Sequence, residues 1–156
     1  MSSRARLPVA VTHEVRDNCL CLHVQRAARA LARHFDETFR PLGLTNGQFS
    51  LLMSLNRPDL PTMREVASLL GLDRTTLTAA LKSLQRRGLV EVRADRKDRR
   101  SRRLILSRTG RALLTKAYPL WERAHAKLEA RLSAGEPDRL RAALTRLPCE
   151  GGRIGS

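Results

Sequence analysis

The sequence predicts a mainly α-helical protein with one small β-hairpin, in the order of four helices, two strands and two helices. Three observations lead to this fold class. Apolar residues recur every three or four positions through most of the chain, as they do in amphipathic helices. Only residues 89–106 have the pattern of two short strands around a polar turn. The length of 156 residues, 42% of them hydrophobic, suits one globular domain.

The first helix is expected over residues 18–40. It follows residues 1–16, which have no periodicity and are predicted to form a flexible arm. Pro41 and Gly43 should end the helix, because neither residue continues an α-helix well. The apolar positions of the helix form one long stripe, made up of Leu20, Val24, Ala27, Ala28, Leu31, Phe35, Phe39 and Leu42.

Two capping boxes mark the starts of the next two helices. Thr45 stands three residues before Gln48, and Thr62 stands three residues before Glu65. In this arrangement each side chain satisfies a backbone amide that the helix itself leaves unpaired. The apolar face of the helix after Thr45 comprises Phe49, Leu52 and Leu55.

The residues around position 72 predict a helix-turn-helix. Gly71 should end the first of two short helices, Asp73 should cap the second, and Gly88 should end it. The second helix carries one buried stripe, which comprises Leu77, Leu81 and Leu84.

The opposite face of this second helix is small, hydroxylated or cationic, and it carries no acid after Asp73. A helix that enters the major groove of DNA needs short side chains for close approach, and hydroxyls and cations for base edges and phosphates. The predicted DNA contacts are Arg74, Thr75, Thr76, Thr78, Lys82 and Arg86. The alternative is an ordinary solvated helix face, although such a face usually mixes charges of both signs.

The hairpin predicted after Gly88 is strongly basic. Between Arg93 and Arg103 there are seven Lys or Arg residues and two Asp residues, which is more charge than a β-turn needs. Arginines on a projecting hairpin can enter a minor groove or bind phosphates. The predicted DNA contacts are Arg96, Lys97, Arg99, Arg100 and Arg102, and Asp98 is predicted to pair with Arg100 and orient its guanidinium. A disordered basic loop without directed contacts is the alternative.

Two helices should complete the chain. Ser107 is expected to cap a long helix in which Pro119 predicts a kink, and a last helix should follow from about Pro137, with a tail at residues 149–156. The apolar positions of the long helix are Leu113, Leu114, Ala117, Leu120, Trp121, Ala124, Leu128 and Leu132. The first helix and this one carry more apolar surface than one small lobe can cover, so we expect a homodimer.

The net charge of +15, from 30 Lys and Arg against 15 Asp and Glu, favours a polyanionic partner, most often a nucleic acid. An arginine-rich proteome would be the uninteresting explanation. A sequence-neutral architectural protein is the alternative function, but the aromatic residues lie on apolar helix faces rather than on a stacking surface. A sequence-specific binder of double-stranded DNA fits the helix and hairpin better.

Several other classes of protein are not expected. The chain has no catalytic or phosphate-loop motif, so we expect neither an enzyme nor a cofactor. No apolar run approaches the roughly 18 residues of a membrane span, and residues 1–10 lack the apolar core of a signal peptide. We therefore expect a cytoplasmic protein without a membrane partner.

Residues 18–148 resemble the MarR (multiple antibiotic resistance regulator) family of winged helix-turn-helix transcription regulators. The resemblance is carried by residues 73–90, which look like the recognition helix and first wing strand, and by the wing signature Asp98, Arg100, Leu106 and Ser107. It implies a domain over residues 17–148, with a winged helix-turn-helix at about 45–107 and dimerisation helices at about 18–40 and 107–148. It also implies a homodimer on a pseudo-palindromic operator, repression, and a small-molecule or redox sensing site between the dimer interface and the DNA-binding lobe.

Cys19 and Cys21 open the first predicted helix, where the helix dipole stabilises a thiolate. The resemblance to the organic-hydroperoxide-sensing branch of the family places Cys21 at the reactive cysteine, and Cys149 near the partner chain's first helix. Gln25 and Phe35 stand where that branch has tyrosines. The alternative is that these cysteines only pack as small apolar residues. A metal site with His23 is not expected, because Cys21 points away from the other two side chains on a continuous helix.

Overall fold

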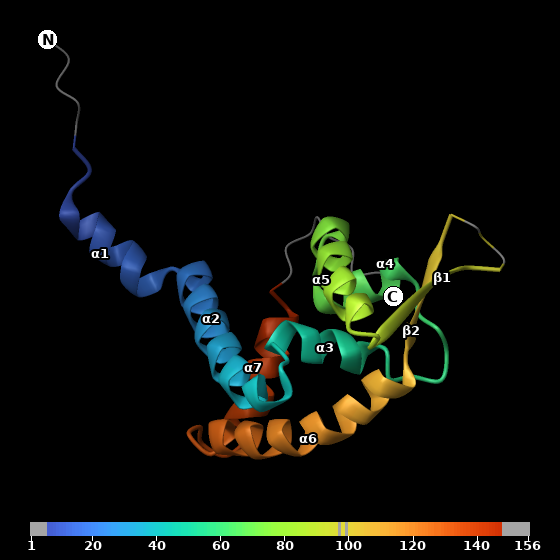
Figure 1. Ribbon diagram of the computed structural model, residues 1–156. Coiled ribbons are helices and arrows are strands. Elements are labelled where there is room, and N and C mark those ends of the chain that lie inside the picture. The colour runs from blue at the N-terminus through green and yellow to red at the C-terminus, as the bar shows by residue number, and fades with distance from the viewer. Residues whose placement is uncertain (1–5, 97, 99, 148–156) are drawn as a thin grey trace, which may run out of the picture. The chain divides into compact units, whose positions relative to one another are not determined.

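The computed structural model describes residues 6–96, 98 and 100–147. It has the predicted mainly helical fold with one hairpin (Figure 1). The chain divides into two compact units, of which the first ends at His34 and the second begins at Phe35. The elements are α1 (Val9–Asn18), α2 (Leu20–Phe39), the 3-10 helix η1 (Arg40–Leu42), α3 (Asn46–Ser54), α4 (Met63–Leu70), α5 (Arg74–Arg86), β1 (Val90–Ala94), β2 (Arg102–Leu106), α6 (Arg108–Glu129) and α7 (Glu136–Thr145). No helix in the described part of the chain is long and apolar enough to span a membrane.

Helix α1 lies where the sequence predicted a flexible arm. It buries no residue, and its valines lie on both sides of the helix, so the apolar pattern gave no signal for it. The helix ends at Cys19, whose extended backbone separates α1 from α2 and whose amide donates to the Val15 carbonyl at 2.9 Å. Residues 9–16 are therefore helical and not the flexible arm that was predicted.

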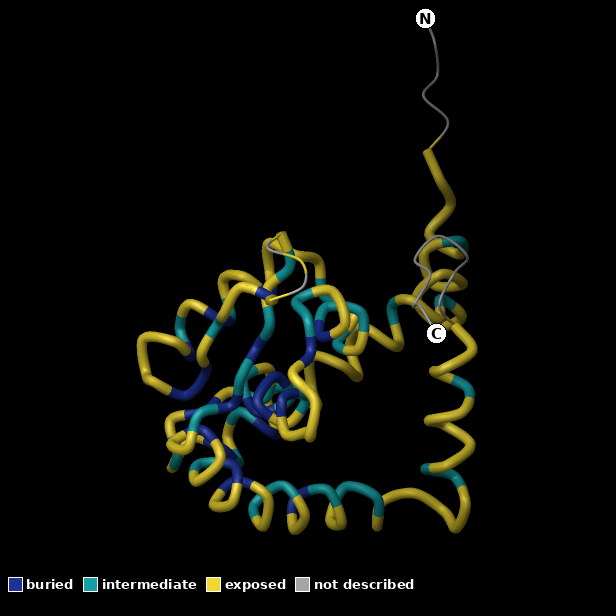
Figure 2. Tube along the Cα trace, turned by 90° about the vertical axis from the view of Figure 1, so that its right-hand side faces the viewer, coloured by how far each residue is buried: buried dark blue, intermediate teal, exposed yellow. Residues whose placement is uncertain are grey.

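The core of the second unit is formed by α3, α4, α5, the hairpin and α6, together with the end of α2. Figure 2 shows the buried residues of the chain gathered together. The Phe39 ring stacks on both Phe35 and Phe49, with ring centroids 6.1 and 4.4 Å apart. This core holds one face of α5 inside the unit and leaves the opposite face outside.

The predicted helix caps are confirmed. Thr45 with Gln48 and Thr62 with Glu65 form complete capping boxes at the starts of α3 and α4. The Thr62 amide and hydroxyl donate to Glu65 Oε2 at 2.6 and 2.8 Å. These bonds hold the pKa of the Glu65 carboxyl below its ordinary value, because they stabilise its ionised form. Gly71 ends α4 with a φ of +63°, a conformation that favours glycine.

The predicted hairpin is also confirmed. Strands β1 and β2 pair antiparallel, with Val90 opposite Leu106 and Ala94 opposite Arg102. Leu104 and Leu106 turn their side chains into the core, while the residues beside them are more exposed. The two strands extend away from the helices of this unit (Figure 1).

The Ser107 side chain caps α6, because its Oγ accepts a hydrogen bond from the Gly110 amide at 2.9 Å. Pro119 lies inside α6, which bends along its length in Figure 1. Helix α7 begins after Gly135, which has a φ of +74°, and buries no residue. The leucines of α7 that remain exposed are Leu140 and Leu144.

Candidate nucleic-acid interface

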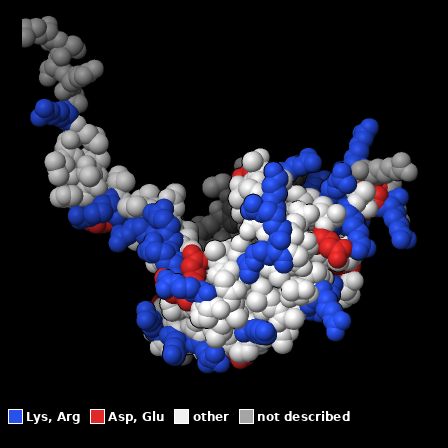
Figure 3. Space-filling view, in the orientation of Figure 1, with Lys and Arg blue, Asp and Glu red and all other residues white. Residues whose placement is uncertain are grey.

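The exposed face of α5 carries the side chains that the sequence predicted to contact DNA. Leu77, Leu81 and Leu84 are buried against the core. The predicted residues Arg74, Thr75, Thr76, Thr78, Lys82 and Arg86 are all exposed. At the end of the helix, Arg87 Nη1 donates to the Gly43 carbonyl at 2.7 Å, which ties α5 to the loop before α3. Figure 3 shows Lys and Arg side chains gathered over α5 and around the hairpin.

The hydroxyls near the start of α5 have different tasks. The Thr76 amide and hydroxyl donate to the two Asp73 carboxylate oxygens at 2.8 and 2.7 Å. These hydrogen bonds lower the pKa of Asp73 and complete the helix cap. The Thr78 hydroxyl donates to the Arg74 carbonyl at 2.7 Å, so its oxygen still has a lone pair to accept a bond. Thr76 is therefore occupied by the cap, whereas Thr75 has no side-chain hydrogen bond within the described residues.

The tip of the hairpin presents cations to solvent. Arg96, Arg100 and Arg102 are exposed. The other two predicted contacts, Lys97 and Arg99, lie outside the described residues. The tip extends away from the helices, at the right of Figure 1, where Figure 3 shows Lys and Arg.

The predicted pairing of Asp98 with the Arg100 guanidinium is corrected by the structure. Asp98 Oδ1 accepts a hydrogen bond from the Arg100 backbone amide at 2.9 Å, and the Asp98 carbonyl accepts one from the Ser101 amide at 2.9 Å. A short side chain at this place in a turn reaches the backbone two residues on more readily than a long mobile guanidinium. Asp98 therefore orders the backbone of the turn, and the Arg100 guanidinium has no partner within the described part of the chain.

Two of the seven hairpin cations are paired with carboxylates of the same hairpin, which the charge count did not reveal. Arg103 Nε donates to Asp95, and Arg103 Nη1 donates to the Leu60 carbonyl at 2.7 Å. Arg93 Nη2 donates to Glu91 on the same strand at 2.6 Å. The Asp95–Arg103 contact could have been predicted only from the hairpin pattern, because a hairpin brings the residues at the two ends of its turn together. The contact with Leu60 has no local signal, because 43 residues separate the partners.

The cysteines lie at the junction of α1 and α2. Cys19 is half-buried and Cys21 is exposed, while Cys149 lies outside the described residues. Gln25 Nε2 donates to Cys21 Sγ at 3.1 Å, so the glutamine provides a hydrogen bond at a position where the hydroperoxide-sensing branch has a tyrosine. Phe35, at the other of these two positions, is buried in the core of the second unit and has no hydroxyl group. The described residues contain no cluster of three potential metal ligands.

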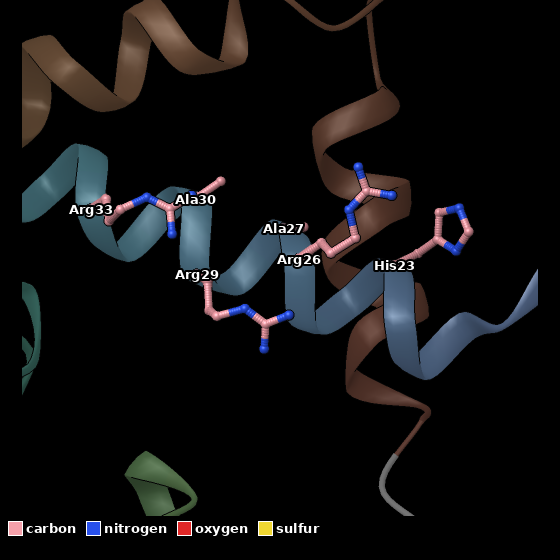
Figure 4. A pocket seen from close by; sticks show the side chains of 6 residues that line it. All are labelled: His23, Arg26, Ala27, Arg29, Ala30 and Arg33. Carbon is pink, nitrogen blue, oxygen red and sulfur yellow. The ribbon is translucent and has the colours of Figure 1, made fainter. Parts of the chain in front are cut away.

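A shallow pocket follows one side of α2. Its lining residues are His23, Arg26, Ala27, Arg29, Ala30 and Arg33 (Figure 4). The alanine methyl groups lie between cationic side chains, and Arg29 Nη1 donates to the Gln25 amide oxygen at 3.3 Å. This pocket was not predicted from the sequence. The recurrence of Arg26, Arg29 and Arg33 at helical spacing was the signal for it.

The comparisons with known proteins agree with this geometry. The MarR family pattern matches residues 42–101, which include α4, α5 and the first strand of the hairpin. The transcriptional regulator MosR of M. tuberculosis, solved in complex with DNA, is 41% identical, with a TM-score of 0.73 over 82% of this chain and 93% of that chain. A mutant MarR from E. coli, solved with operator DNA, is 25% identical, with a TM-score of 0.77 over 86% of this chain and 96% of that chain.

Two curated relatives are regulators as well. The organic hydroperoxide resistance transcriptional regulator of Bacillus subtilis is 28% identical over 69% of this chain and 74% of its own length. TtmR of Methylorubrum extorquens, an HTH-type transcriptional regulator, is 35% identical over 62% of this chain, and the match spans half of its length. With the exposed basic face of α5 and the hairpin beside it, these similarities show that the chain belongs to the MarR family of sequence-specific DNA-binding transcription regulators, which are not enzymes.

Proposed function

We propose that this protein represses transcription as a homodimer bound to a pseudo-palindromic operator, and that a small-molecule or oxidant signal releases it. The observation that carries this proposal is the acid-free exposed face of α5, next to a hairpin whose described arginines Arg96, Arg100 and Arg102 are exposed. A two-fold axis would place two such helices about one DNA turn apart. The named relatives are bacterial, and bacterial operators lie in the cytoplasm, where we propose that this protein acts.

The DNA contacts proposed for α5 are Arg74, Thr75, Thr78, Lys82 and Arg86, with Thr76 acting first as part of the cap. Those proposed for the wing are Arg96, Lys97, Arg99, Arg100 and Arg102, around the turn that Asp98 orders. The helix would contact bases in the major groove, and the wing would contact phosphates or the adjacent minor groove.

The replacement Arg100→Ala should weaken operator binding by about 1–3 kcal/mol, roughly 5- to 150-fold. Arg100 is exposed at the wing tip, and the turn around it is fixed by Asp98, so its loss removes a directed contact. Fluorescence anisotropy on duplexes from the upstream region of the gene would measure the change. Lys116→Ala is the matched control, since Lys116 is exposed on α6, away from α5 (Figure 1). Equal losses in the two variants would show that only total charge matters.

A homodimer is proposed because α2 and α7 expose leucines that a monomer would leave in water. Leu20 is 68% exposed, and Leu140 and Leu144 are 49% and 43% exposed. Sedimentation at low micromolar concentration should give a dimer. The double replacement Leu140→Ser and Leu144→Ser should shift it toward monomer, whereas Leu60→Ser, in the exposed loop before α4, should not. A stable folded monomer of the unaltered protein, at 17.5 kDa, would contradict the proposal.

Oxidation of Cys21, with Cys19 or Cys149 as its partner, is the second proposed route of release. Cys21 is exposed, and Gln25 Nε2 donates a hydrogen bond to its sulfur at 3.1 Å. The thiolate would attack a hydroperoxide, an alkoxide would leave, and the resulting sulfenic acid would condense with a second thiol to a disulfide and water.

Treatment with a mild organic hydroperoxide should therefore produce a disulfide and lower operator affinity. Non-reducing gels and anisotropy would follow both effects in parallel, with Cys21→Ser as the variant that should lose them. A cross-linked dimer would indicate Cys149, and an unchanged mobility with loss of free thiols would indicate Cys19. If the oxidised protein binds its operator as before, the cysteines only pack, and the signal is a small molecule.

A further inference from the structure

The base of the wing contains an ion pair whose carboxylate is buried. Asp95 is only 8% exposed, and no other charged residue in the described part of the chain is buried. It lies directly after β1, and its amide donates to the Ser101 carbonyl at 3.0 Å, which closes the turn. Its carboxylate accepts a hydrogen bond from Arg103 Nε on the opposite strand. A buried carboxylate needs such a partner, because a charge away from water is costly when it is unpaired.

Arg103 connects this pair to a distant loop. Its Nη1 donates to the Leu60 carbonyl at 2.7 Å, so one guanidinium joins the two ends of the wing turn to the loop between α3 and α4. The same loop is joined to β2 at the next residue, where the Leu104 amide donates to the Pro61 carbonyl at 2.9 Å. Thr62, which caps α4, forms an isolated bridge with Arg103. The wing is therefore attached to the first helix of the helix-turn-helix.

A partly buried ion pair of this kind is weak evidence for stability, because the desolvation of its charges offsets much of their attraction. It does fix a geometry, because a guanidinium that donates to two acceptors allows few orientations of the chains that carry them. Here the acceptors belong to the wing and to the segment that leads into α4. The cations Arg96, Arg100 and Arg102 lie just beyond this attachment, so a small rotation at the base would move them furthest.

We propose that Asp95 and Arg103 are positioning residues for operator recognition, which set the direction of the wing relative to α4 and α5. They do so without contacting DNA, through the hydrogen bonds to the Leu60 carbonyl and between themselves. The inference rests on the proposed binding of an operator by α5 and the wing together. It assigns the specificity of the wing to a pair of residues at its base, in addition to the arginines at its tip.

The test compares Asp95→Asn with Glu91→Gln. Each replacement removes one negative charge from the hairpin and breaks one ion pair with an arginine, but the Glu91–Arg93 pair is exposed. Removal of a negative charge alone should strengthen DNA binding. If Asp95 positions the wing, Asp95→Asn should instead weaken operator binding about tenfold or more, while binding to random duplex stays equal or rises. Glu91→Gln should bind both duplexes as well as or better than the unaltered protein.

Circular dichroism and thermal melting of each variant distinguish a positioning role of Asp95 from a role in stability alone. If Asp95 only stabilises the fold, its replacement should lower the melting temperature and should weaken binding to the operator and to random duplex alike. If Asp95→Asn does not fold, Arg103→Lys takes its place, since lysine keeps the charge but lacks the planar guanidinium whose separate nitrogens donate to the two acceptors in a fixed geometry. A folded Arg103→Lys protein with unchanged preference for the operator would overturn the proposal, as would an Asp95→Asn protein that behaves like Glu91→Gln. A lack of operator preference in the unaltered protein would instead overturn the proposed function.

Discussion

An increase in salt from about 50 to 200 mM should weaken operator binding by about 10³- to 10⁵-fold. The reason is that each phosphate neutralised by a Lys or Arg releases condensed counterions, so added salt opposes binding. The cations described on this surface of each protomer are Arg74, Lys82, Arg86, Arg96, Arg100 and Arg102. Two protomers that together neutralise about 6–10 phosphates would give a slope of about −5 to −9 in a plot of log affinity against log salt.

Anisotropy titrations at four or five salt concentrations would measure this slope. The replacement Lys82→Gln removes one exposed cation of α5 from each protomer, and so about two phosphate contacts from each dimer. The slope should become less negative by about two. Lys116→Gln on α6 makes the same change of charge away from α5 and should leave the slope unchanged. A slope near −1 for the unaltered protein would mean that neither α5 nor the wing lies against the phosphates.

The parts of the fold that could be predicted from the sequence have local causes. The capping boxes of Thr45 and Thr62 need only residues three positions apart, and both are formed in the structure. The outward face of α5 follows from three leucines at helical spacing, all of which are buried. The hairpin follows from two short β-prone segments around a polar turn, and its strands pair as expected.

The parts that could not be predicted depend on contacts between distant residues or lack an apolar face. Helix α1 packs no side chain into a core, so its sequence carries no periodicity to recognise. In the sequence, Arg103 is one of seven cations of the hairpin, and nothing nearby distinguishes it from the others. In the structure its guanidinium donates to the Leu60 carbonyl, 43 positions away in the chain. The side chain of Asp98 was expected to hold a guanidinium and instead bonds a backbone amide, because turn geometry decides that contact.

The replacement Gly110→Ala should lower the free energy of unfolding by about 1–3 kcal/mol or more. A Cβ on Gly110 would lie 2.3 Å from the Leu89 carbonyl oxygen and 2.8 Å from Leu106 Cδ1. The carbonyl cannot turn aside freely, because it accepts a hydrogen bond from the Ser107 amide at 3.1 Å. The start of α6 would have to move away from the hairpin, and this movement would strain the junction that holds the wing to the core.

Gly47→Ala is the matched control for this prediction. Gly47 also lies near the start of a helix, α3, but a Cβ there would meet no atom within 4 Å. Because alanine restricts the unfolded chain and favours a helix, this replacement should stabilise the protein by about 0.4–1 kcal/mol. Denaturant unfolding at one fixed protein concentration would compare the two variants, so that dimerisation contributes equally. Opposite signs are expected, and a Gly110→Ala protein as stable as Gly47→Ala would show that α6 and the hairpin do not approach each other this closely.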